Sequence, residues 1–261
     1  MIGAVHYKLR AVNSARLPLI NGRLMHAAFF KILHNIAPEI ENFVHEKMNI
    51  NPFTVSFLDP RSDLPIFEDR WQVKRGDKFF WRVTGLNDEI LNAALNVPEG
   101  YELQAGNLNL EVESVEGKII SVEDFILNVK ELLPVNEIEF EFLTPVSFRI
   151  DDYDAPFPRA ELIFPSIADK WTQAQMPAAV DKKFIRELAA QIRLTEWQGQ
   201  CKKFYFGRDR GTLAFWGTFR YSLKQLVDDL KKVFMLLAKF AEYSGTGRLS
   251  GQGFGQTRVK F

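Results

Sequence analysis

The stretch that says most about the fold is EYSGTGRLSGQGFGQTRVKF, residues 242–261. It follows a strongly helical pattern and places five glycines within eleven residues: Gly245, Gly247, Gly251, Gly253 and Gly255. Gly245 stands where the C-terminal cap of a helix is expected. Because glycine lacks a Cβ and accepts positive φ, the others would let backbone approach backbone or a ligand. The loop follows a helix and lacks G-K-[ST], which excludes the Rossmann and Walker loops.

The region before this loop predicts one α+β domain. Residues 223–245 form an amphipathic helix with an apolar stripe, and residues 201–223 read as a hairpin that turns at GRDRG. Around them the pattern predicts a strand over 137–150, helix over 164–174 and 181–192, and a last strand over 254–261.

The first half shows a similar order of elements. Strands and helices alternate as strand 3–12, helix 23–36, strand 50–58, strand 77–86, helix 87–96 and strand 108–117. This is the ferredoxin-like layout, in which two helices pack on one face of an antiparallel sheet. We therefore predict an α+β protein of two tandem ferredoxin-like (RRM-like) domains, residues 1–133 and 134–261, divided near Pro134. The two halves show no direct sequence identity.

Composition sets the broad class. The chain has 261 residues, of which 46% are apolar and 25% charged, as in proteins with a sizeable core. A single cysteine, Cys201, excludes an intramolecular disulfide and a Cys-rich zinc site and suits a reducing cytosol. Because no secretory signal or membrane-spanning segment is visible, we expect a cytoplasmic protein with no membrane partner. We also expect no metal site and no cofactor.

Charge is unevenly distributed along the chain. The net charge is zero, yet residues 182–261 hold 16 Lys and Arg against 6 Asp and Glu, a balance of +10. Such an asymmetry concentrates the field that attracts a polyanion. Charge by itself favours the simpler interpretation, a solvated basic face that has no partner.

Two separated motifs resemble one known family. The segment GTGRLSGQGFG fits a glycine loop of the form G-h-G-x-x-x-x-x-G-h-G, with Thr246 and Phe254 at the h positions, and FVHEKMNINPFTVSF resembles a signature in which a short helix ends at a His-Glu pair. The segment RLPLINGRLMHAAFFKIL resembles the first helix of the same family. Together they are similar to the CRISPR-associated endoribonucleases of the Cas-six type. Thr246 is less apolar than that pattern usually has.

The resemblance implies an activity. These enzymes cut CRISPR precursor RNA within its repeats without metal. The ribose 2′-OH attacks the neighbouring phosphate and leaves a 2′,3′-cyclic phosphate and a 5′-OH. That step needs a base, an acid and positive charge or N–H donors for the phosphorane, and histidine suits proton exchange near neutrality.

His45 matches the position of the family's usual catalytic histidine. It is our first choice as acid or base, although a histidine at a helix C-terminus can also serve only as a cap. His26 on the first helix is the second choice, whereas His34 and His6 are expected to be structural. Where some members carry a lysine and a tyrosine, this chain has Asn51 and Phe30, so phosphorane stabilisation falls to Lys47, Lys31 or Arg248.

RNA binding is expected from the glycine loop and the basic surface around it. The residues concerned are Gly245, Gly247, Arg248, Gly253, Gly255, Lys202, Lys203, Arg208, Arg210, Arg220 and Arg258, with Lys31 on the first helix. Arginine–phosphate contacts would fix register, and a stem-loop would be read largely by shape.

Two alternatives remain open: a non-cleaving RNA-binding relative, and a structural subunit of an interference complex. The predicted partners are repeat RNA, other subunits of such a complex and a second copy of the chain.

Overall fold

The computed structural model describes residues 1–40, 52–205 and 211–261, which form two compact units. Unit 1 contains Met1–Ile120 together with Gly251–Gly253, and unit 2 contains Ser121–Ser250 and Phe254–Phe261. Within the described ranges no helix is both long and apolar enough to span a membrane.

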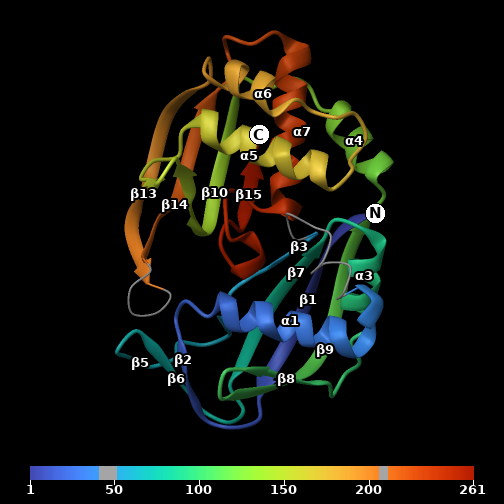
Figure 1. The fold of residues 1–261 in the computed structure, drawn as a ribbon, viewed down its shortest axis with the longest axis vertical. Helices are drawn as coiled ribbons and strands as arrows, with labels where there is room; N and C mark the ends of the chain where they lie inside the picture. The colour runs from blue at the N-terminus through green and yellow to red at the C-terminus, as the bar shows by residue number, and fades with distance from the viewer. Residues whose placement is uncertain (41–51, 206–210) are drawn as a thin grey trace. The chain divides into compact units, whose positions relative to one another are not determined.

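Unit 1 is a ferredoxin-like sheet covered by two helices (Figure 1). Its elements are β1 (Ile2–Ala11), β2 (Ala15–Pro18), α1 (Gly22–Ile36), β3 (Phe53–Val55), β4 (Asp59–Pro60), β5 (Ile66–Phe67), β6 (Arg70–Val73), β7 (Lys78–Gly85), α3 (Asp88–Leu95), β8 (Glu102–Ala105) and β9 (Leu108–Ile120). The main sheet runs β3-β7-β1-β9-β8. Helices α1 and α3 follow β1 and β7, which gives the predicted order of strand, helix, strand, strand, helix, strand.

The unit 1 core follows from the alternation of the strands. Val5, Tyr7 and Leu9 of β1 are fully buried, while His6 and Lys8 between them face solvent. Helix α1 closes over this face through buried Met25 and Phe29. Asn87 caps the N-terminus of α3, since its side chain accepts a hydrogen bond from the N–H of Ile90.

Unit 2 repeats the layout. Its elements are α4 (Val122–Lys130), β10 (Glu137–Val146), β11 (Phe148–Ile150), β12 (Tyr153–Ala155), α5 (Ala160–Gln173), α6 (Lys182–Ala189), β13 (Arg193–Tyr205), β14 (Gly211–Ser222), α7 (Asp228–Ser244), the 3-10 turn η1 (Ser250–Gln252), of which only Ser250 belongs to this unit, and β15 (Thr257–Lys260). The sheet runs β13-β14-β10-β15, and α5 and α7 lie on one face of it (Figure 1). The α+β class with ferredoxin-like units is thereby confirmed.

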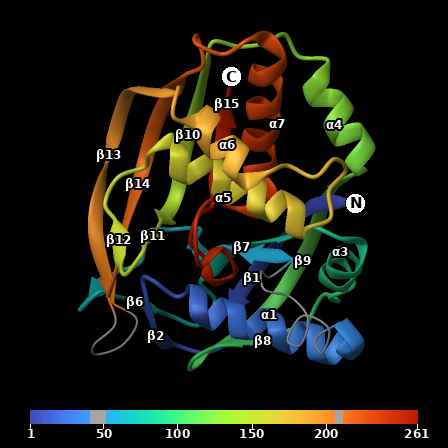
Figure 2. The same cartoon turned by 45° about the horizontal axis from the view of Figure 1, so that its top comes forward.

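Several details differ from the sequence prediction. The β11–β12 hairpin, which lies beside β14 (Figure 2), and the small sheet β2-β6-β5 were not predicted. Helix α7 begins at Asp228 and not at residue 223, so Leu226, which falls inside the predicted helix, lies in the preceding turn, where it is buried. Helix α4 packs on α7, and the contacts therefore group residues 121–133 with unit 2 instead of dividing the chain near Pro134.

Candidate functional site

The described residues include only some of the predicted site. His45 and Lys47 fall in 41–51, and Arg208 and Arg210 fall in 206–210, so all four lie outside the described residues. Their roles stay predictions. Within the described residues, the candidate site consists of His26, the glycine loop and the remaining predicted cations.

His26 lies in the second turn of α1, half-buried against two aromatic rings that also contact each other. Its ring meets Phe30 edge-on, with centroids 4.7 Å apart, and stacks near Phe53 of β3 at 5.7 Å. On the other side, its Nδ1 lies 2.7 Å from the carbonyl oxygen of Gly251. Gly251 belongs to the Gly251–Gly253 segment that groups with unit 1. A residue more than two hundred positions away thus sets the orientation of this imidazole.

The hydrogen bond from His26 also fixes its tautomer. A carbonyl oxygen can only accept, so Nδ1 must carry the proton and donate to Gly251. In the neutral ring the other nitrogen, Nε2, then holds a lone pair. Such a nitrogen can take a proton from a hydroxyl group.

The glycine loop is packed tightly, and positive φ is used throughout it. Gly245 caps α7 at φ +66°, with its N–H donating to Ala241, which confirms the predicted cap. Gly247, Gly253 and Gly255 also have positive φ, at +74°, +89° and +71°. A Cβ on Gly255 would lie 2.1 Å from the Thr246 carbonyl oxygen, so only glycine fits this approach of backbone to backbone.

Two of the loop glycines already use their backbone N–H groups inside the protein. The N–H of Gly245 donates to Ala241, and that of Gly255 donates to Pro145 at 2.9 Å. Gly247 and Gly253 are buried. The glycines therefore have a demonstrated packing role, whereas their contact with RNA remains a prediction.

The predicted arginines that fall within the described residues are engaged with carboxylates. Arg248 pairs with Asp154 at 3.2 Å. On the open face of the unit 2 sheet, Arg258 pairs with Glu141 at 3.0 Å, and Arg220 pairs with Glu139 and Glu196. Hydrogen bonds from Arg220 and Lys260 hold the pKa of Glu139 below its ordinary value. RNA phosphates would have to compete with these carboxylates.

Strand β13 carries the remaining predicted cations. Lys202 and Lys203 are exposed near the end of this edge strand, and the Lys203 ammonium lies 5.6 Å from the ring centre of Tyr205. In the described part of the chain no carboxylate forms an ion pair with either lysine. In sequence they shortly precede the predicted GRDRG turn, so both lysines remain candidates for phosphate contact.

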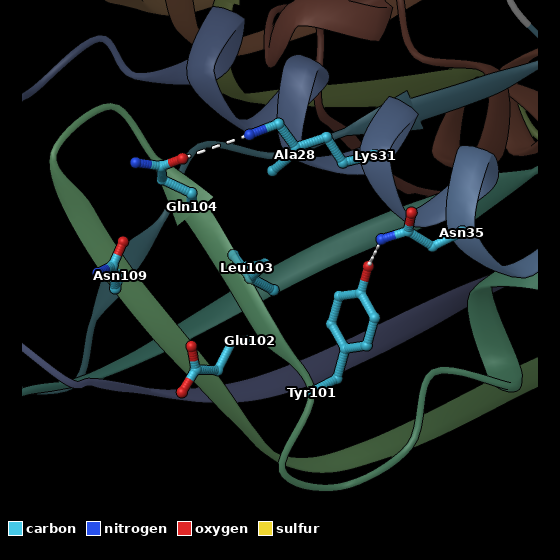
Figure 3. Close-up of a pocket in the computed structure, with 8 residues that line it drawn as sticks. All are labelled: Ala28, Lys31, Asn35, Tyr101, Glu102, Leu103, Gln104 and Asn109. Carbon is cyan, nitrogen blue, oxygen red and sulfur yellow. Dashed lines mark hydrogen bonds between the residues drawn. The ribbon is translucent and has the colours of Figure 1, made fainter.

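Lys31 faces a different part of unit 1. Figure 3 shows its side chain directed from α1 to Gln104, with Nζ 3.3 Å from Oε1, and Asn35 donating to the Tyr101 hydroxyl. These groups line a cavity of about 250 Å³ between α1 and β8. Lys31 follows His26 by five positions, which turns it about 140° around the helix axis. It therefore points away from the surroundings of the His26 ring.

The other histidines are peripheral. His34 is exposed in the last turn of α1. On the outer face of β1, partial burial lowers the pKa of His6, and the charges of Arg82 and Lys118 lower it further. Across residues 1–40, 52–205 and 211–261, no group of three or more His, Cys, Asp or Glu side chains is arranged to hold a metal ion.

One residue of interest was missed by sequence reasoning. Lys170 of α5 is 4% exposed and donates hydrogen bonds to the segment that leads into the glycine loop. The available signal was its position between Ile167 and Trp171, both of which are apolar residues on the buried face of α5. A lysine on such a face needs internal acceptors.

The sequence is similar to proteins of one known family. Residues 140–257 match the family model described as CRISPR-associated endoribonuclease Cas6. The curated Cas6 endoribonuclease of Mycobacterium tuberculosis is 24% identical over 188 residues, which cover 69% of this chain and 58% of that protein. The match thus spans less than two thirds of the curated relative.

Solved structures extend the likeness to the complete fold. A Cas6 product complex superposes with a TM-score of 0.76 at 24% identity and covers 100% of both chains. Thermus thermophilus Cas6 superposes with a TM-score of 0.69 at 23% identity, covering 100% of this chain and 98% of the other. At these identities the superpositions establish a shared fold.

Proposed function

We propose that this chain, which belongs to the Cas6 family of CRISPR-associated proteins, is an endoribonuclease that cleaves CRISPR precursor RNA within its repeats. The reaction proposed is metal-independent. The 2′-oxygen attacks the adjacent phosphorus, the bond from phosphorus to the 5′-oxygen breaks, and the products carry a 2′,3′-cyclic phosphate and a 5′-OH. One proton leaves the 2′-OH, and one is added to the departing 5′-oxygen.

The observation that carries the proposal is the hydrogen bond between His26 Nδ1 and the Gly251 carbonyl, at 2.7 Å. It leaves Nε2 of the neutral ring unprotonated, as a general base for the 2′-OH requires. We assign this task to His26 and the acid task to His45. An imidazolium beside the leaving oxygen would supply the second proton, and histidine's ordinary pKa near 6.5 allows both forms to coexist near neutrality.

The same observation favours cleavage over the alternative of a non-cleaving RNA-binding subunit. A protein that only gripped RNA would need cations and surface shape, but no imidazole held in one tautomer. The contacts of the half-buried His26 ring with Phe30 and Phe53, together with its hydrogen bond to Gly251, limit its reorientation. That restraint is useful for proton transfer, because general catalysis depends on placing the base accurately.

For substrate binding we assign the phosphate contacts to the end of the β13–β14 hairpin. Lys202 and Lys203 lie there outside the carboxylate pairs that neutralise Arg220 and Arg258. Arg208 and Arg210 of the GRDRG segment would extend this cationic surface. It accounts for part of the positive balance of the last third of the chain.

The test is cleavage of a synthetic repeat RNA in the presence of EDTA, beside the same RNA with one 2′-deoxy substitution at the cut site. The proposal predicts cleavage of the first RNA and none of the second. Dependence on added divalent metal, or cutting of the deoxy-substituted RNA, would disprove this mechanism.

A further inference from the structure

Lys170 is a buried ammonium group whose three N–H donors are all used. From α5, its Nζ donates to the carbonyl oxygens of Ser244 and Gly245, each at 3.0 Å, and to the Ser250 hydroxyl at 3.1 Å. The neighbouring carboxylate, Asp169, pairs instead with Lys182 at 2.8 Å. Lys170 is thus satisfied by neutral oxygens of one segment.

Burial of a lysine at this position costs free energy of folding, because the ammonium group loses its water. Removal from water disfavours the charged form, and burial lowers the pKa of Lys170 to about 7, although Asp169 partly offsets the effect. An apolar residue of similar size would fill the space without this penalty. Because stability does not require a lysine here, we look for its role in the loop conformation that its three hydrogen bonds select.

The three acceptors lie at the two ends of the same short segment. Ser244 and Gly245 end helix α7, whose last carbonyl groups have no partner within the helix. Ser250 begins η1, after Leu249, which has φ +62°. Lys170 thus ties the end of α7 to the start of η1 and fixes the path of residues 245–250 between them.

Ser250 is covalently adjacent to Gly251, the residue whose carbonyl oxygen accepts from His26 Nδ1. Any displacement of Ser250 is passed through one peptide unit to that carbonyl. We propose that Lys170 is a positioning residue for His26: by holding Ser250 it sets the Gly251 carbonyl, which in turn selects the His26 tautomer with Nε2 unprotonated.

Lys170 keeps its contacts with Ser244, Gly245 and Ser250 when it loses its proton. A neutral amine retains two N–H donors, which suffice for the Ser244 and Gly245 carbonyls, and it gains a lone pair. The Ser250 hydroxyl can then donate to that lone pair, because a hydroxyl both donates and accepts. A carbonyl at position 250 could not make this exchange. The serine side chain therefore suits a lysine that titrates near neutrality.

The test compares Ser250→Ala and Lys170→Met with Ser244→Ala. Ser250→Ala removes only the bond to η1. Lys170→Met removes all three bonds while keeping the apolar stem. Ser244→Ala deletes a buried hydroxyl of the same loop that donates to Gly245, and it leaves the lysine's bonds intact because Lys170 binds the Ser244 backbone carbonyl.

The first readout is the His26 tautomer, measured by long-range ¹H–¹⁵N NMR of the complete protein and assigned with His26→Asn. We expect the wild type and Ser244→Ala to show Nδ1–H, while Ser250→Ala and Lys170→Met gain Nε2–H. This readout needs no RNA and no activity. If Ser250→Ala keeps the wild-type tautomer, the inference is wrong, even where Lys170→Met fails to fold.

The second readout rests on the proposed function. In single-turnover cleavage of repeat RNA, Ser250→Ala should slow the chemical step by about tenfold or more, since small displacements of a base cost one to two orders of magnitude. The dissociation constant for RNA should change less than about twofold in the same variant. Equal loss of rate in Ser244→Ala would reduce Lys170 to a packing residue. If the wild type cuts no RNA, the proposed function fails, while the tautomer measurement still tests whether Lys170 positions His26.

Discussion

Replacement of Gly255 by alanine should destabilise unit 2 severely, for two separate reasons. At φ +71°, an L-residue with a Cβ is strained by about 1–2 kcal/mol. In addition, the new Cβ would lie 2.1 Å from the carbonyl oxygen and 2.9 Å from the nitrogen of Thr246, so backbone must move. Those atoms belong to a hydrogen-bonded pair, because the Thr246 N–H donates to Gly255 at 2.9 Å.

The magnitude follows from what the movement breaks. Gly255 takes part in two backbone hydrogen bonds: its carbonyl accepts from Thr246 and its N–H donates to Pro145. Each buried bond that loses a partner costs about 1–3 kcal/mol. With the strain of positive φ, loss of both bonds would cost about 3–8 kcal/mol, so Gly255→Ala should lower the free energy of unfolding by at least about 3 kcal/mol.

Gly100→Ala is the matched control. Gly100 has φ +80°, yet no atom lies within 4 Å of its would-be Cβ. It should therefore cost only the conformational strain, about 1–2 kcal/mol. Urea denaturation followed by tryptophan fluorescence measures both variants against the wild type. If the two substitutions cost the same within about 1 kcal/mol, the claim that Gly255 is required by close backbone packing is refuted.

Three further results are expected. His26→Ala should slow single-turnover cleavage by about 10²–10⁴-fold, whereas His34→Ala, on the same helix but exposed, should cut at nearly the wild-type rate; equal losses would remove His26 from the mechanism. Because burial lowers the pKa of Lys170 to about 7 while the unfolded chain keeps the ordinary value of 10.5, only the unfolded state holds this proton between those pH values. The free energy of unfolding should therefore rise with pH there, by at most about 1.4 kcal/mol per pH unit, and Lys170→Met should lack that rise in urea titrations at pH 7 to 9. Changing Lys202 and Lys203 together to glutamine should weaken RNA binding and lower the slope of log affinity against log salt by about two, while Arg258→Gln, which disrupts a pair with Glu141, should alter the slope by less than one; the reverse ranking would move the phosphate contacts to the open sheet face.

Much of the fold could be predicted because local pattern and tertiary structure agree. The alternation in β1, the Asn87 cap of α3 and the stripe of α7 each reflect one periodicity or one hydrogen bond close in sequence. The small sheet β2-β6-β5 could not be predicted, since its strands have two to four residues and β2 pairs with β6 far along the chain.

The sequence could identify candidate residues of the site, but it could not identify the atoms that they contact. The His26 ring could be identified as a candidate, but its partner is the Gly251 backbone carbonyl, and every residue has such a carbonyl. Lys170 was missed because its acceptors are two carbonyls and a serine more than seventy positions away. Conversely, the pairing of Arg220 with Glu139 and Glu196 depends on strand register, which sequence reasoning left undefined.

The most direct test of the central claim is the chemistry of the new RNA ends. Wild-type protein and repeat RNA are incubated in EDTA, and both fragments are analysed by mass spectrometry. Histidine-driven attack by the 2′-OH predicts a 2′,3′-cyclic phosphate on the upstream fragment and a 5′-OH on the downstream one. A 3′-OH paired with a 5′-phosphate would show that water, and not the ribose, attacks the phosphorus, and would contradict the mechanism.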